Sequence, residues 1–187
     1  MNTRFRQDVL VFVGLVAVGV ATRLAPYYTG QETWNMTATA GAALFAGFYF
    51  ADLRIALLVP LLAMIMSDLL IGGYDGLMMA ANYAGMSIAV LPGALARKGR
   101  WRLAVIPAAL VASLAFFAVS NLGVWFCWYP RTWQGLLTCY ANAIPFFRGT
   151  LAGDLLFSIA FFGVYDLAID SGWILAVQPQ ADLEPAR

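Results

Sequence analysis

The chain contains no histidine, only two cysteines and few charged side chains. Without histidine, serine–histidine triads, H-E-x-x-H zinc sites and histidine-ligated haem are excluded. No G-x-x-x-x-G-K-[ST] stretch is present, so the chain lacks the phosphate-binding loop that it would need to hydrolyse ATP by itself. We therefore expect neither an enzyme nor a bound cofactor. The net charge of +1 gives no indication of a nucleic-acid partner.

Charged residues make up 11% of the 187 residues, whereas hydrophobic residues make up 62%. A soluble domain of this length needs more charged surface, so we expect an integral membrane protein with a single domain, 1–187. Arg4 and Arg6 precede the first apolar run, but no small-residue cleavage site opens into a polar chain. We therefore expect a retained first helix rather than a signal peptide. Cys127 and Cys139 do not form a disulfide framework, and a bridge between them is left open.

Apolar segments long enough to cross a bilayer as helices, roughly 17–25 residues, recur along the chain. They predict an all-α membrane protein with six transmembrane helices. The expected spans are 9–25, 36–51, 55–72, 77–96, 103–128 and 150–169. An aromatic-rich segment separates the last two spans and predicts a short interfacial helix over about 132–143, closed by Pro145.

Basic residues indicate how the chain is oriented. With the N-terminus inside, the cytoplasmic side receives Arg4, Arg6, Arg54, Arg97, Lys98, Arg100, Arg102 and Arg187, and the outer side receives Arg23, Arg131 and Arg148. The positive-inside rule therefore predicts that both termini are cytoplasmic, with membrane lipid as a partner. The loop ARKGRWR is a topology anchor or a lipid-headgroup site.

Two aspartates lie within apolar segments. Asp68 in MIMSDLLIGGYDG and Asp154 in TLAGDLLF share the pattern [SG]-D-L-L. A carboxylate inside the bilayer is costly, so it needs a partner or a wet cavity. Both lie near the outer ends of their spans in the expected topology. We expect Arg148 to lie near Asp154, whose carboxylate would also be stabilised by the start of its helix.

Aromatic and amide side chains gather on the same outer face. They are Trp34, Asn35, Tyr74, Asp75, Asn82, Tyr83, Asn121, Trp125, Trp128, Tyr129 and Tyr140. Such a surface suits a flat small molecule with polar edges, although aromatics also form a belt at the bilayer interface. The residues that we expect to bind substrate are Asn35, Asp68, Tyr74, Asn82, Tyr83, Asn121, Trp125, Tyr129, Arg148 and Asp154.

Small residues form a stripe on the first span. Ala17, Ala21 and Ala25 repeat at four-residue spacing, with Gly14 and Gly19 nearby. Such a stripe lets another backbone approach closely. The second backbone belongs either to a neighbouring span or to a separate membrane protein.

Three segments resemble a known family: LVPLLAMIMSDLLIG (58–72), SNLGVW (120–125) and YPRTWQGLLTCYANAIPFFRGTLAGDLLF (129–157). They are similar to small bacterial membrane proteins described as transporters, which look related to the substrate-binding S components of energy-coupling-factor (ECF) vitamin transporters. Solitary S components that import cobalamin are similar too. The resemblance covers most of 34–165, and its final block is the most specific part. It implies a six-helix S-component fold, cytoplasmic termini and an outer-face substrate pocket closed by loops.

The resemblance also implies a partner and a substrate. An A-x-x-x-A motif on the first span of S components docks them onto a transmembrane coupling protein, and Ala17 and Ala21 match it. Solitary cobalamin members can offer a loop cysteine to cobalt, but the loop GGYDGLMMAANY has none. Cys139 and Cys127 remain as chemically suitable soft ligands. We expect an uptake protein for a vitamin-sized solute, with cobalamin or another corrinoid as the leading substrate.

Two other classes fit parts of the sequence. An intramembrane aspartyl protease would use two aspartates to activate water. Tyr74 and Asp75 match its Y-D motif, but Leu151 stands where its G-x-G-D motif has the first glycine. A non-catalytic scaffold or assembly subunit would use the alanine stripe as its working surface.

Overall fold

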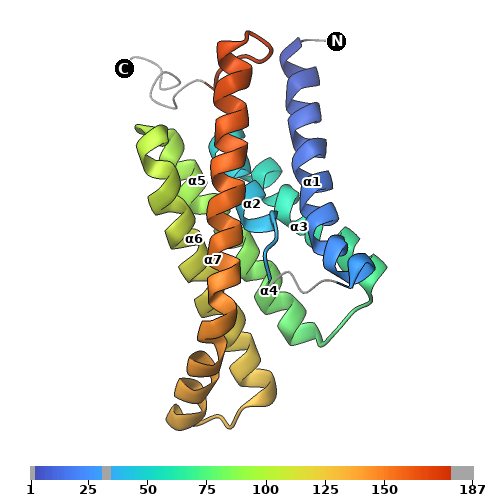
Figure 1. The fold of residues 1–187 in the computed structure, drawn as a ribbon, viewed down its shortest axis with the longest axis vertical. Helices are drawn as coiled ribbons and strands as arrows, with labels where there is room; N and C mark the ends of the chain where they lie inside the picture. The colour runs from blue at the N-terminus through green and yellow to red at the C-terminus, as the bar shows by residue number, and fades with distance from the viewer. Residues whose placement is uncertain (1–2, 31–34, 178–187) are drawn as a thin grey trace.

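The computed structural model describes residues 3–30 and 35–177. Of these residues, 84% are helical and none lies in a strand. The helices are α1 (Thr3–Thr29), α2 (Thr39–Tyr49), α3 (Leu53–Ile71), α4 (Gly76–Ile88), α5 (Val90–Arg97), α6 (Trp101–Trp128) and α7 (Trp133–Asp170) (Figure 1). Trp34 and Arg187, which entered the sequence predictions, lie outside the described residues.

Helix α2 forms the centre of the bundle, and all 11 of its residues are buried. It packs against α1, α3, α5 and α7. Its contact with α5 is made by backbone: a Cβ atom added to Gly47 would overlap the carbonyl group of Val90, and one added to Gly93 would overlap that of Leu44. Glycine at both positions therefore lets the two helices touch.

The two ends of the described chain meet at one end of the bundle (Figure 1). Gln7 Nε2 donates to the carbonyl oxygen of Leu175 at 3.1 Å and to the Tyr49 hydroxyl at 2.7 Å. Tyr49 in turn donates to Asp8 Oδ1 at 2.9 Å. Buried rings pack beside these hydrogen bonds, among them Phe45, Phe48, Phe162 and Tyr165. This end is thus fixed by both apolar packing and hydrogen bonds.

Five helical segments are long and apolar enough to cross a membrane: Thr3–Thr29, Leu53–Ile71, Gly76–Arg97, Trp101–Trp128 and Trp133–Asp170. The segment Gly76–Arg97 joins α4 and α5. Helix α2 rises only about 17 Å, which is shorter than a hydrocarbon core of about 30 Å. Among the described residues, α2 is therefore apolar and buried but too short to span a membrane on its own.

The separate interfacial helix over 132–143 was a wrong prediction, because α7 runs without interruption for 38 residues and Pro145 lies inside it. The start was predicted well: Thr132 Oγ1 accepts the N–H of Gly135 at 3.1 Å and caps the helix. A proline removes one backbone donor, but membrane helices tolerate this when neighbouring groups supply other partners. Pro26, Pro60 and Pro107 also lie inside helices.

Candidate functional site

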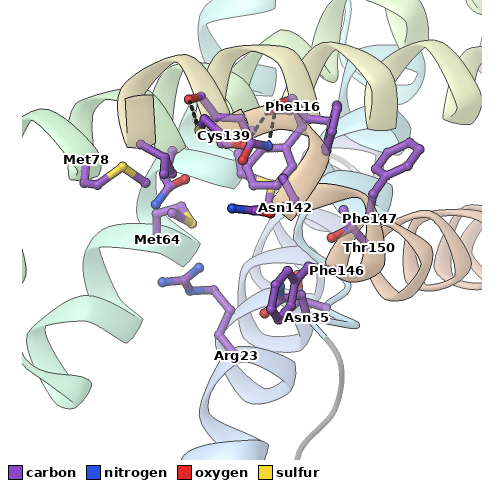
Figure 2. A pocket seen from close by; sticks show the side chains of 18 of the residues that line it. Arg23, Asn35, Met64, Met78, Phe116, Cys139, Asn142, Phe146, Phe147 and Thr150 are labelled. Atoms are coloured by element: carbon purple, nitrogen blue, oxygen red, sulfur yellow. Dashed lines mark hydrogen bonds between the residues drawn. The ribbon is translucent and has the colours of Figure 1, made fainter. Parts of the chain in front are cut away.

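A cavity of about 450 Å³ lies between α1, α3, α4, α6 and α7 (Figure 2). Its lining includes Arg23 near the end of α1, Asn121 near the end of α6 and Cys139 near the start of α7, and these helix ends lie away from the chain ends (Figure 1). Its polar edge is formed by Arg23, Asn35, Thr37, Asn82, Ser120, Asn121, Tyr129, Asn142 and Thr150. Its walls are formed mainly by Met64, Met78, Met86, Phe116, Phe117, Phe146 and Phe147. Four carboxamides thus face a space lined by methionine and phenylalanine.

Four of the ten residues predicted to bind substrate line this cavity: Asn35, Asn82, Asn121 and Tyr129. Asn35 has a φ of 61°, a left-handed conformation that asparagine tolerates better than most residues. The backbone therefore turns at Asn35, shortly before α2 begins at Thr39. This local turn brings the Asn35 side chain to the cavity.

Asp68 does not line the cavity itself, but it forms an ion pair with Arg23, which does. Arg23 Nη2 donates to Asp68 Oδ1, and Tyr83 Oη donates to Asp68 Oδ2 at 2.9 Å. Arg23 Nε also donates to Ser67 Oγ at 2.6 Å. The Arg23 side chain is 16% exposed and that of Asp68 is 4% exposed. The cavity therefore presents a guanidinium group whose charge is balanced by the carboxylate beside it.

The sequence placed Arg23 on the outer side, but Arg23 was not among the residues predicted to bind substrate. The sequence did contain a signal for it, because an aspartate inside a span requires a counter-charge. Asn142 was also missed. It lies only three residues before Pro145, in the segment that was expected to lie at the interface.

Two tyrosines hold amides at the cavity edge. Asn82 Nδ2 donates to Tyr74 Oη at 3.0 Å, and Asn142 Nδ2 donates to Tyr129 Oη at 3.1 Å. Trp125, by contrast, donates through Nε1 to the carbonyl oxygen of Pro130 at 2.9 Å and does not line the cavity. Trp125 therefore secures the turn between α6 and α7.

Asp154 is 3% exposed, and its Oδ2 lies 2.6 Å from Ser113 Oγ on α6. The predicted pair of Arg148 with Asp154 was wrong: within residues 3–30 and 35–177, Asp154 forms no ion pair. Helix α7 is continuous through both residues, and six residues of α-helix rise about 9 Å and turn by about 600°. The two side chains therefore leave different faces. Arg148 instead borders a second depression with Met36, Pro145 and Gly149.

The two cysteines are separate free thiols, so the disulfide left open by the sequence is not formed. Cys139 is buried and lines the cavity, with its Sγ 3.5 Å from the carbonyl oxygen of Asn121. Cys127 donates to Asp75 Oδ1 at 3.2 Å and does not line the cavity. Within the part of the chain that the structure describes, no group of three or more histidine, cysteine or acidic residues could hold a metal ion.

Asp75 caps the start of α4. Its Oδ1 accepts the backbone N–H of Met78 at 3.0 Å, as an N-cap does. This bond, followed by the one from Cys127, lowers the pKa of the Asp75 carboxyl. Asp75 therefore stays ionised and fixes the first turn of α4, the helix that carries Asn82.

The apolar helices and the arrangement of polar groups between them define an all-α, multi-pass membrane protein. Residues 3–175 match the model of DUF6580, a family of unknown function, and the chain belongs to this family. No curated protein and no solved structure matches the chain.

Proposed function

We propose that this protein is a membrane uptake protein that binds a vitamin-sized solute in the cavity, in the manner of an ECF S component. The cavity of about 450 Å³ is the observation that carries the proposal. Ligand sites in proteins commonly measure about 300–1,000 Å³ and combine apolar walls with a few placed polar groups. Methionine and phenylalanine would cover the faces of a flat ring system, while the carboxamides would bind its polar edges.

The proposed orientation places the cavity at the outer face of a bacterial inner membrane. The end of the bundle that holds both chain ends also carries the basic residues at the start of α1, between α5 and α6, and at the start of α3. By the positive-inside rule this end would be cytoplasmic. In this proposal α2 lies across the membrane centre as the sixth span, shielded by its neighbours.

The size of the cavity favours a solute smaller than a corrinoid. A corrin ring with its nucleotide tail is several times larger than a single-ring or fused-ring vitamin, so it would enter only if the cavity-forming ends of α6 and α7 moved apart. Cys139 is the cysteine placed to meet a cobalt atom there, because it lines the cavity and Cys127 does not. The chain would release its solute inward either with an ATP-driven coupling module or by downhill flux.

A thermal-shift screen in mild detergent tests the binding proposal. A solute at about 100 times its dissociation constant stabilises a fold by about 2.7 kcal/mol, so one water-soluble vitamin is expected to raise the melting temperature saturably. Asn82→Leu removes an amide from the cavity and is expected to abolish that shift. Gln134→Leu removes an exposed amide on α7 outside the cavity and is expected to retain it. A panel of vitamins and corrinoids that shifts nothing, or a shift unchanged in Asn82→Leu, contradicts a solute site here.

A specific observation supports a partner-docking role for α1. Ala17 and Ala21 are exposed, and a methyl group added to Gly14 would meet no atom within 4 Å. Gly19 packs against Ala63 of α3, whereas no helix among the described residues covers Ala17 and Ala21. We propose that a transmembrane coupling protein packs on this exposed part of the stripe. A scaffold subunit would use the same surface without binding a solute.

Ala17→Leu with Ala21→Leu separates these two roles. We expect the variant to keep its vitamin-induced thermal shift and to lose most of the uptake measured in cells, because leucine prevents close helix approach. Ala152→Leu with Ala160→Leu is the matched control, since both alanines are exposed on α7. Unchanged uptake in the α1 variant rules out docking through the stripe, and stripe-dependent complex formation without any solute binding favours the scaffold.

A further inference from the structure

A buried polar stripe leads from the cavity into the centre of the bundle. Thr150, Asp154 and Ser158 follow one another at four-residue spacing on α7 and are 7%, 3% and 1% exposed. Thr150 lines the cavity. Asp154 therefore lies one helical turn beyond the cavity wall, where water does not reach it in this conformation.

The hydrogen bonds around Ser113 indicate the protonation state of Asp154. Ser113 Oγ lies 2.6 Å from Asp154 Oδ2 and 3.0 Å from the carbonyl oxygen of Ala109. A serine hydroxyl has one proton to donate, so it cannot donate to both oxygens. If Asp154 were ionised, one of these two oxygen–oxygen contacts, both within hydrogen-bond distance, would contain no proton.

A neutral carboxyl group resolves this conflict. The Asp154 O–H then donates to Ser113 Oγ, and the Ser113 O–H donates to the carbonyl oxygen of Ala109. Each of the two contacts becomes a normal hydrogen bond with one proton. The neutral form also avoids burying a carboxylate that has no counter-charge, which membrane interiors strongly disfavour.

Within the described residues, the helices packed against α7 bring no charged group to Asp154. These helices are α2 and α6. Helix α2 contains no charged residue, and the one charged residue of α6, Arg102, pairs with Asp166 at 2.9 Å. On α7 itself, Arg148 points from a different face. Asp68, the other aspartate with the [SG]-D-L-L pattern, instead has both Arg23 and Tyr83 as donors.

We propose that Asp154 is a proton-binding site in the interior of the bundle, with Ser113 as the acceptor that holds the proton in place. When water enters from the Thr150 side, the carboxyl O–H bond breaks and the proton passes to water. The Ser113 hydroxyl then turns from Ala109 to the new carboxylate. Opening of the cavity is thereby coupled to release of one proton. This inference rests on the hydrogen-bond geometry and is independent of which solute, if any, the cavity binds.

Ser158 lies one helical turn beyond Asp154 on the same polar stripe of α7. Ser158 Oγ is buried and, within the described residues, has no hydrogen-bond partner. It lies on the same face of α7 as Asp154, four residues further along. Ser158 therefore supplies a second hydroxyl towards which a proton or a water molecule could move from Asp154.

Infrared spectroscopy of the full chain in lipid vesicles at neutral pH tests the proton site. A protonated carboxyl group gives a carbonyl-stretching band that shifts in D₂O, and we expect the wild type to show one. Asp154→Asn is expected to remove the band while keeping the fold, because its amide can donate to Ser113 as the carboxyl does. Asp68→Asn is the matched control and is expected to leave the band in place.

Ser113→Ala gives a second readout that does not depend on removing the carboxyl group. The Asp154 proton loses its acceptor in this variant, so the band is expected to move to higher frequency. Three results would overturn the proposal: no protonated-carboxyl band in the wild type, a band that persists in Asp154→Asn, or a band that disappears when Na⁺ replaces K⁺ at constant pH. The last result would assign the site to a metal cation.

Discussion

Gly47→Ala and Gly93→Ala are each expected to destabilise the bundle strongly, although each adds a single methyl group. The added carbon on Gly47 would overlap the carbonyl group of Val90, and that on Gly93 would overlap the carbonyl group of Leu44. Both obstacles are backbone atoms, so no side chain can rotate away and α2 must separate from α5. Because every residue of α2 is buried, this separation also disturbs its other contacts.

Overpacking a core costs about 1–3 kcal/mol and occasionally more, and a backbone obstacle places these variants at the upper end. For a chain of this length, 3 kcal/mol corresponds to a fall in melting temperature of about 6–12 °C. Thermal unfolding in detergent and the yield of monodisperse protein measure the effect.

Gly163→Ala provides the matched control. Gly163 lies in α7, is exposed, and a methyl group added to it would meet no atom within 4 Å. Alanine is favoured over glycine in a helix by about 1 kcal/mol, so this variant is expected to melt at the same temperature or slightly higher. If Gly47→Ala and Gly163→Ala had the same melting temperature, α2 and α5 would not be in backbone contact.

The apolar helices could be predicted from hydropathy because a bilayer imposes the same length on each of them. The ends of the helices could not. Helix α1 begins at Thr3 rather than at residue 9, and α7 begins at Trp133 rather than at residue 150. Hydropathy detects the part of a helix that lies in hydrocarbon, whereas capping and packing extend helices beyond it. The start near Thr132 was predicted from the sequence, but Pro145, which was expected to close the helix, lies inside it.

The polar residues of the candidate site were predictable from the sequence, because a polar side chain inside an apolar segment stands out by its chemistry. Amides such as Asn82 and Asn121 inside apolar segments require partners, and they do line the cavity. Met64 and Phe116, which form part of its walls, are indistinguishable in sequence from lipid-facing residues. The error over Arg148 and Asp154 followed directly from the assumed break at Pro145, since a continuous helix turns the two side chains to different faces.

Asp68→Asn is expected to lower the free energy of unfolding by about 3 kcal/mol, because breaking a buried ion pair leaves an uncompensated charge. Arg23 would then keep its bond to Ser67 but lose its carboxylate partner. The new amide still offers an oxygen to the hydroxyl of Tyr83, so the loss reports on charge rather than on a missing acceptor. The measurement is thermal unfolding in detergent, where a fall of about 6–12 °C is expected.

Arg23→Met combined with Asp68→Asn removes both charges and keeps the acceptor for Tyr83. This double variant is expected to be more stable than Asp68→Asn alone, because no buried charge remains unpaired. Equal loss in the single and double variants would show that the amide disturbs packing and that the ion pair is not the cause. Arg23 also lines the cavity. A double variant that folds but shows no thermal shift with any vitamin would support the proposed role of the guanidinium group in solute binding, separately from its charge balance with Asp68.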